Sequence, residues 1–218
     1  MVKIKIELKY FCILLSVIGI VVLYFLSLFS QPTIIKLSEI SSYEGKQVIV
    51  QGITKEYYTT TYGSQIITIE EENTSTKVFL EGMIPIEYGD ILQATGTVQK
   101  YKDSWEIVVD NIHYVNIVKK WSNISMPLWQ IAENPNRYSG LNVNISGYVD
   151  TINEDYFYLS DLEGKHSIIV NYIYQNDFFL IPGLKVNVAA RFSYDTGDFR
   201  YILEISENVH GIFPAGVE

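Results

Sequence analysis

The chain has 218 residues, a formal net charge of −9 at pH 7 and one cysteine, Cys12. Because an acidic surface repels phosphate groups, this charge weighs against binding to nucleic acid or to an anionic lipid surface through overall charge alone. A single cysteine excludes disulfides within the chain and thiolate metal clusters.

An uninterrupted apolar block occupies residues 10–29, and none of its 20 residues is charged. As an α-helix the block would extend about 30 Å, which matches the hydrocarbon core of a bilayer. It is longer than the apolar core of a cleaved signal peptide, and large residues stand where a peptidase expects small ones. We therefore predict an uncleaved membrane anchor within residues 1–30.

The charges on either side of this block predict its orientation. Three lysines and one glutamate precede it, and few positive charges follow it closely. The positive-inside rule then leaves the N-terminus in the cytoplasm, with a single pass through the cell membrane and the rest of the chain outside the cytoplasm. Residues 31–218 keep 13 of the 16 basic and 24 of the 25 acidic residues, which is a formal charge of −11.

The stretch at residues 43–52 occurs a second time, without a gap, at residues 138–147. Both copies follow the frame Tyr-x-Gly-x-x-Val-x-aliphatic-x-Gly, and their alternating apolar residues indicate a strand buried on one face. Residues 89–98 and 183–192 match in the same way and in the same order. This duplication predicts two β domains, at residues 31–122 and 123–218.

The two halves contain similar series of predicted elements. In the first half we expect a short helix with Ser38 as its cap, a tyrosine-rich connection at 55–64 and a loop or single turn at 82–90. The expected helix spans 37–43, and the strands span 48–52, 65–70, 76–81, 91–99 and 105–115. In the second half a helix-like segment at 126–134, ended by Pro135, precedes strands at 142–149, 156–160 and 166–174. A strand opened by Gly183 and a last strand led by Phe199, in the place of Trp105, complete the second half.

This series resembles the OB-fold, especially its nucleic-acid-binding and anticodon-binding-like group. The shared features are a helix-like start, the glycine-framed first strand, a hairpin, a Gly-Asp-x-Leu-x-Ala-x-Gly-x-Val strand and an aromatic-led last strand. The resemblance covers most of residues 36–118 and 126–213. It implies an all-β chain of two tandem five-stranded barrels, which would follow the one N-terminal transmembrane helix predicted from the apolar block. OB-folds bind oligonucleotides, oligosaccharides and proteins across strands two and three.

Aromatic and basic side chains mapped onto that face form the candidate ligand-binding set. They could stack on bases or sugar rings, although tyrosine is also an ordinary residue for covering a half-buried sheet. The first half, with eight basic residues against five in the second, is the better candidate for an anionic ligand. The candidate residues are Tyr57, Tyr58, Tyr62, Phe79, Lys100, Tyr101, Trp105, Tyr156, Tyr158, Tyr172 and Tyr174.

Other motifs are weaker. Asn73 and Asn123 begin acceptor sequences for N-glycosylation, and so does Asn144, which lies within a predicted strand. The acidic runs at 70–72 and 195–198 lack the spacing of a calcium loop, and the three histidines are isolated in the sequence. We find no catalytic constellation and predict neither a cofactor nor a metal site.

The sequence therefore predicts a single-pass membrane protein that presents tandem OB-fold binding or scaffold domains outside the cytoplasm, without catalytic activity. A protein or oligosaccharide partner is expected. One alternative is a protein that binds single-stranded nucleic acid. Another is a haem carrier similar to the haem chaperones of cytochrome c maturation, which attach haem through a histidine after the barrel. His210 has a similar place, but Pro214 stands where that family has tyrosine.

Overall fold

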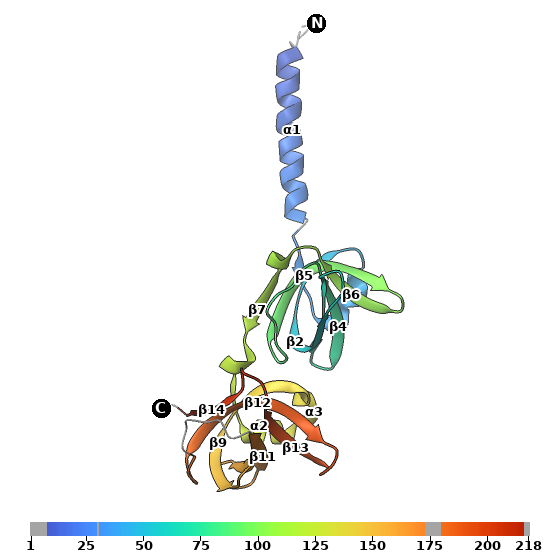
Figure 1. Cartoon of the computed structure of the whole chain (residues 1–218). Helices are drawn as coiled ribbons and strands as arrows, with labels where there is room; N and C mark the ends of the chain where they lie inside the picture. Colours follow the sequence, from blue (N-terminus) through green and yellow to red (C-terminus); the bar gives the residue numbers. More distant parts are fainter. Residues whose placement is uncertain (1–7, 30, 173–179, 216–218) are drawn as a thin grey trace.

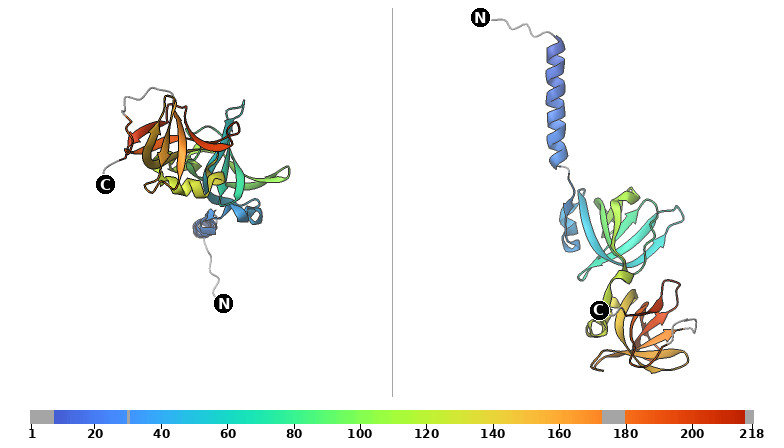
Figure 2. Two further views of the ribbon diagram at one scale, coloured as in Figure 1. Left: turned by 90° about the horizontal axis from the view of Figure 1, so that it is seen from below. Right: turned by 90° about the vertical axis from the view of Figure 1, so that its left-hand side faces the viewer.

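The computed structural model describes residues 8–29, 31–172 and 180–215. An N-terminal helix and two β-sheets follow one another along the molecule (Figure 1). The first sheet lies between the helix and the second sheet, and the right-hand view of Figure 2 shows the same order. The amino-terminal helix thus projects from the end of the molecule opposite to the second sheet.

Helix α1 comprises Leu8–Phe29, so the apolar block is helical. Its large apolar side chains between Tyr10 and Phe25 are 45% to 67% exposed and are not covered by either sheet. Over the described residues, no helix meets both the length and the hydropathy needed to cross a membrane. The membrane anchor stays a prediction.

The first sheet closes into a five-stranded barrel. In spatial order its strands are β2 (Gln47–Thr59), β3 (Gln65–Glu71), β4 (Thr74–Leu80), β6 (Ser104–Val109) and β5 (Ile91–Tyr101). β5 pairs with β2 to close the barrel, β4 and β6 run parallel, and the other neighbours are antiparallel. Two short strands extend the sheet, β1 (Thr33–Ile34) beside β2 and β7 (Val115–Lys119) beside β5.

The second sheet repeats this arrangement strand by strand. Its barrel contains β9 (Leu141–Ile152), β10 (Tyr156–Ser160), β11 (Ser167–Tyr172), β13 (Arg200–Ile205) and β12 (Lys185–Asp195), and β12 pairs with β9. β11 and β13 are the parallel pair. The added strands recur as β8 (Ser125–Pro127) beside β9 and β14 (Gly211–Pro214) beside β12.

Both barrels have the strand order one, two, three, five, four, with strands three and five parallel, and this is the topology of the OB-fold. The predicted resemblance and the predicted all-β barrels are therefore confirmed. Each barrel has its own core of alternating strand residues, as the repeat frame requires. Val48 and Val50 in the first copy and Val143 and Ile145 in the second are all buried.

The segments before each barrel differ from their predictions. Residues 37–43 do form a helix, but it is the 3-10 helix η1 (Leu37–Tyr43), and Ser38 does not cap it because Lys36 holds the N-cap position. In the second half the predicted helix is α2 (Leu128–Glu133), which starts two residues later than expected and ends before Pro135 as predicted. Pro135 also begins a second short helix, α3 (Pro135–Tyr138), which was not predicted, because a proline needs no hydrogen-bond acceptor in the first helical turn.

Two further predictions for the first barrel are wrong. The strand expected at 105–115 ends at Val109 as β6, and after a 3-10 turn, η2 (Ile112–Tyr114), the chain continues as β7. The Asn111 side chain starts this turn by accepting a hydrogen bond from the His113 N–H at 2.9 Å. The first half of the tyrosine-rich connection at 55–64 is strand, because β2 runs to Thr59 through a bulge near Lys55.

Candidate functional site

An apolar stripe crosses the outer face of the first barrel. On neighbouring strands, Tyr58 pairs with Ile66, and Ile66 pairs with Phe79. Phe79 in turn pairs with Val108 on β6. Directly paired residues lie on the same face of a sheet. Tyr58 is 54% exposed and the other three side chains are half-buried, so an apolar strip open to solvent spans four strands. We call these four residues the outer stripe.

A row of polar side chains borders the outer stripe on the same four strands. It consists of paired residues, namely Glu56, Thr68, Lys77 and Glu106. Gln99 on β5 extends the row and donates a hydrogen bond to Glu106 Oε1 at 2.6 Å. A ligand lying on the outer stripe would therefore meet both donors and acceptors along one side.

The structure brings only two of the predicted first-barrel aromatics, Tyr58 and Phe79, into the outer stripe. Tyr57 lies on the other face of β2, with its ring centroid 4.9 Å from that of Tyr88. Burial raises the pKa of Tyr57, as does the nearby Tyr88. Tyr57 therefore serves packing, whereas Tyr62 is 94% exposed in the loop between β2 and β3.

The remaining predicted residues of this barrel gather at the hairpin between β5 and β6. Trp105 is half-buried against the barrel core, and Lys100 Nζ lies 5.9 Å from its ring centroid. Lys102 Nζ lies 5.4 Å from the ring of Tyr101, which is 56% exposed. These two cation–π pairs make the hairpin a basic, aromatic projection that is separate from the outer stripe.

The second barrel has a different outer face. Tyr156 and Tyr158 do share the outer face of β10, with ring centroids 5.8 Å apart. The row that Tyr156 begins continues with polar residues, since Asn171, Glu204 and Arg191 follow on successive strands. The row that Tyr158 begins continues with Ile169 and Ile202, but both of these are buried. The second barrel therefore has no solvent-exposed counterpart of the outer stripe among these paired residues.

One predicted residue of the second barrel leaves the candidate set. Tyr172 is 6% exposed, with its ring centroid 5.7 Å from that of Phe157, because its position on β11 turns it into the core. Tyr174 lies outside the described residues.

A cluster at the junction of the barrels was not predicted. Asp90 is fully buried, and its Oδ1 accepts a hydrogen bond from the Trp121 N–H at 3.1 Å. Its Oδ2 accepts from the Glu87 N–H at 3.0 Å and from Lys120 Nζ at 2.9 Å. Trp121 opens the 3-10 turn η3 (Trp121–Asn123) between the barrels and donates from Nε1 to Glu87 Oε2 at 2.5 Å. One buried carboxylate thus fixes the segment that links the two barrels.

Residues of the second barrel complete this cluster. The Arg191 guanidinium carbon lies 4.0 Å from the centroid of the Tyr88 ring, and the His210 ring meets Trp121 edge-on at 5.9 Å. One sequence signal could have identified the junction. In the second copy the residue that follows the matching glycine is Leu184, so Asp90 departs from the repeat.

His210 lies in this cluster with 9% of its surface exposed. Its Nδ1 accepts hydrogen bonds from the Ser206 and Glu207 N–H groups at 3.3 and 3.2 Å, which requires an unprotonated Nδ1. Burial lowers the pKa of His210, and Glu207 opposes this effect. A buried ring with Nδ1 already engaged does not offer an accessible ligand for haem, so the geometry does not support the haem-carrier alternative.

We expect stability to depend on pH through His210. Because the folded pKa lies below the ordinary value of 6.5, the unfolded chain binds the proton more readily. Stability is therefore lost as the pH falls below about 6.5 and continues to fall through the folded pKa. Melting temperatures between about pH 7.5 and about pH 5 should fall less steeply in His210→Gln than in the wild type. The exposed His113 provides the control, since His113→Gln should keep the wild-type slope, and an unchanged slope in His210→Gln would contradict the assignment.

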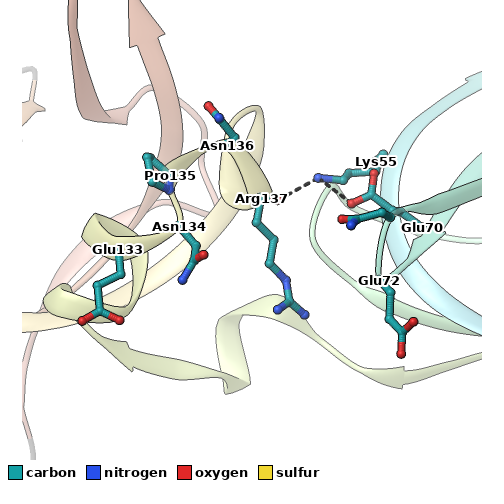
Figure 3. A pocket seen from close by; sticks show the side chains of 9 residues that line it. Lys55, Glu70, Glu72, Glu133, Asn134, Pro135, Asn136 and Arg137 are labelled. Atoms are coloured by element: carbon teal, nitrogen blue, oxygen red, sulfur yellow. Dashed lines mark hydrogen bonds and ion pairs between the residues drawn. The ribbon is translucent and has the colours of Figure 1, made fainter.

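A polar groove runs between the barrels beside this junction (Figure 3). Its volume is about 720 Å³. Arg137 lies in its middle, with Glu133 and Asn134 on one side and Glu70 and Glu72 on the other. One hydrogen bond crosses between the barrels there, from Lys55 Nζ to the Arg137 carbonyl at 2.8 Å, and Lys55 also pairs with Glu70 at 3.4 Å.

The structure places the three candidate glycosylation asparagines differently. Asn73 and Asn123 are exposed, so glycosylation at both stays a prediction. Asn144 donates from Nδ2 to the Ser122 carbonyl at 2.8 Å, which engages the nitrogen that a glycan would need. Within the described residues, no group of three or more His, Cys, Asp or Glu side chains is arranged to hold a metal ion.

Comparison with known proteins finds likeness in structure only. No protein-family model matches the chain, and no curated protein matches it. A murine DNA-binding protein solved with double-stranded DNA is 12% identical, with a TM-score of 0.36, over 79% of this chain and 97% of that chain. The second OB-fold domain of replication protein A from Methanococcus maripaludis is 17% identical, with a TM-score of 0.28, over 35% and 88%. An aspartyl-tRNA synthetase from Leishmania major Friedlin is 17% identical, with a TM-score of 0.36, over 41% of this chain and only 21% of that chain. Likeness at this level does not bear on function.

Proposed function

We propose that this chain is a non-catalytic binding protein, whose first barrel holds a partner on the outer stripe while α1 anchors the molecule in a membrane. The observation that carries the proposal is the outer stripe itself. Its four apolar side chains are paired in register across four strands and remain open to solvent. Contiguous apolar groups on a protein surface are typical of interaction sites, which favours a binding role for the outer stripe.

The dimensions and the charge of the outer stripe favour an extended polypeptide as the partner. Four strands are separated by three spacings, so the strip is about 14 Å long, which is the length of about four extended residues. The bordering row mixes Lys77 with Glu56 and Glu106, and the chain beyond residue 30 carries a formal charge of −11. A nucleic-acid backbone would be repelled by that charge, whereas the backbone of a peptide is neutral.

A membrane anchor is supported by the place of α1 in the molecule. The helix stands away from both barrels (Figure 1). Its large apolar side chains between Tyr10 and Phe25 are exposed. Such exposure is costly in water, since burying each large apolar side chain contributes about 1.5–3 kcal/mol. With the preceding lysines in the cytoplasm, both barrels would lie outside it, and the first barrel would lie nearer to the bilayer.

Protease treatment of intact cells tests the anchor. We expect an added protease to digest both barrels in sealed cells and to leave a membrane-bound fragment that contains α1. A chain without residues 1–30 should appear in the soluble fraction. Barrels that resist the protease until the membrane is lysed would contradict the topology, and sedimentation of the shortened chain with membranes would contradict the anchor.

Site-specific photocrosslinking tests the outer stripe. We expect a photoreactive phenylalanine analogue at Phe79 to form adducts in native membranes, and Tyr58→Ala to reduce their yield by about tenfold, because an aromatic contact residue is lost. The same analogue at Tyr114, which is 48% exposed on η2, provides the control. Adducts removed by protease support a polypeptide partner. Equal yields at Phe79 and Tyr114 would contradict the proposal.

Single-stranded nucleic acid is the second candidate, and the hairpin between β5 and β6 favours it. That hairpin presents Lys100 and Lys102 beside Trp105 and Tyr101, which combines cations with rings for stacking. For this candidate, a labelled oligonucleotide should bind at low salt and weaken steeply as salt increases. Lys100→Gln with Lys102→Gln should then weaken binding, and an absence of binding at low salt would eliminate this function.

A further inference from the structure

An apolar pocket of about 180 Å³ lies at the junction of the barrels. Both barrels and the segment between them contribute to its walls. Ile53 and Ile91 come from the first barrel, Trp121 and Ile124 from the connecting segment, and Met126 and Leu141 from the second half. An apolar protein cavity of about 150 Å³ is large enough to bind benzene. The junction pocket therefore has room for a group of the size of one phenyl ring.

One wall of this pocket contains a buried polar group with an unused donor. Asn142 is 3% exposed, and its Oδ1 accepts a hydrogen bond from Arg191 Nη1 at 3.4 Å. This contact fixes the orientation of the amide, because a guanidinium only donates hydrogen bonds. Among the described residues, no acceptor contacts the buried Asn142 Nδ2. Because neighbouring atoms cover Nδ2, a ligand in the pocket does not reach it, and Asn142 adds a polar group to the wall without contacting the ligand.

Arg137 supplies a cation at the same pocket. It also lines the polar groove and the hollow beside β1, so it lies where three depressions meet. Its side chain is exposed, and it contacts the ring of Tyr138 at 5.9 Å. Within the described part of the chain it forms no ion pair. An exposed guanidinium without an ion-pair partner is suited to bind a carboxylate through two parallel hydrogen bonds.

From the apolar lining and the unpaired cation we propose that the junction pocket binds an apolar carboxylate. A phenyl-sized apolar group occupies the 180 Å³ pocket, and the carboxylate accepts hydrogen bonds from Arg137. Two kinds of molecule carry an apolar group next to a carboxylate. One is a free aryl-substituted carboxylic acid, and the other is the C-terminal residue of a protein chain. The pocket shares no residue with the outer stripe, so the proposal is independent of the partner bound there.

Fluorescence titration of the full chain in detergent tests this site. With Trp105→Phe and Trp129→Phe as the background, Trp121 is the remaining tryptophan and reports directly on the pocket. We expect 3-phenylpropionate to give a saturable change and the uncharged 3-phenylpropanol to bind at least about tenfold more weakly, which corresponds to about 1.4 kcal/mol. No saturable change up to about 10 mM 3-phenylpropionate, well above the 1 mM that corresponds to weak binding, would overturn the proposal.

Two substitutions localise the effect. Arg137→Gln should weaken the carboxylate by about tenfold without changing the binding of the alcohol. Arg200→Gln is the matched control and should leave both affinities unchanged, because Arg200 pairs with Asp198 on the hairpin between β12 and β13. Ile124→Phe should fill the pocket and abolish binding while the melting temperature confirms folding. Equal affinity in Arg137→Gln and wild type, or full binding to folded Ile124→Phe, would overturn the proposal.

Peptides distinguish the two sources. If a chain terminus is the ligand, a short peptide that ends in phenylalanine with a free carboxylate should bind more tightly than 3-phenylpropionate, and amidation of its end should abolish binding. If this peptide and 3-phenylpropionate bind with equal affinity, the ligand class is the free acid. Binding of the amidated peptide as tightly as the free one would overturn the role of the carboxylate.

Discussion

Replacing Asp90 with alanine lowers the free energy of unfolding by about 3 kcal/mol, because each buried donor that loses its acceptor costs about 1–3 kcal/mol. Asp90 is fully buried and satisfies the Trp121 and Glu87 N–H groups together with the Lys120 ammonium. Alanine leaves two backbone donors without their acceptor, whereas the Lys120 ammonium loses one of its partners and keeps the Pro85 carbonyl at 3.2 Å and Glu87 at 3.7 Å. Urea unfolding followed by tryptophan fluorescence measures the change, because Trp121 lies within the affected cluster.

Two variants separate this loss from a general effect of removing a carboxylate. Asp198→Ala removes an exposed carboxylate that pairs with Arg200, and it should change the free energy of unfolding by less than about 1 kcal/mol. Asp90→Asn keeps an acceptor oxygen in the same place and should recover part of the loss. A loss of less than about 1 kcal/mol in Asp90→Ala would show that the junction does not depend on this carboxylate.

Replacing Gly96 with alanine destabilises the first barrel by about 3 kcal/mol, because overpacking in a well-packed core costs about 1–3 kcal/mol or more. A Cβ at this position would lie 2.5 Å from the Val108 carbonyl oxygen, 2.7 Å from Ile107 Cγ2 and 2.8 Å from Val109 Cγ2. One of these contacts is with backbone, so a change of rotamer cannot relieve it. The barrel must open between β5 and β6 to accommodate the methyl group.

Gly197→Ala provides the comparison for this substitution. Gly197 lies on the hairpin between β12 and β13, and its added Cβ would meet only a flexible carboxylate oxygen of Asp195, at 3.2 Å. We expect a change of less than about 1 kcal/mol there, measured by the same urea unfolding. Similar losses in Gly96→Ala and Gly197→Ala would mean that the barrel adjusts at low cost, contrary to the geometry.

The sequence predicts the barrel strands best where one face is buried. The strand at 156–160 has the predicted bounds, and β2 and β9 contain the predicted first strands at 48–52 and 142–149. Gly147 is the last residue of the second copy, and a Cβ added there would lie 2.7 Å from Leu159 Cγ. The repeated glycine therefore marks a close approach of two strands. Burial and close approach act on each strand locally, and both leave a regular pattern in the sequence.

The candidate sites were only partly predictable. The sequence named Tyr58 and Phe79, but it placed Tyr57 and Tyr172 with them, and the structure puts these two in packed positions. Side chains alternate between the two faces of a strand. The face of a given residue can be assigned only when the bulges and the ends of the strand are known. The bulge near Lys55 shifts that alternation within β2.

By itself the sequence determined the β class and the duplication, because these follow from short-range periodicity and from glycines at fixed spacing. The OB-type order of strands was implied only by the resemblance and was established by the strand pairing. The sequence also determined that residues 10–29 are apolar without interruption. Only the tertiary structure decided which side chains meet across strands and between barrels. The outer stripe depends on pairing between β2, β3, β4 and β6, and the junction pocket depends on residues from Ile53 to Val143. Contacts between residues so distant in the chain leave no periodic signal, because they are set by the closure of each barrel and by the packing of Asp90, Trp121 and Arg191 between the two.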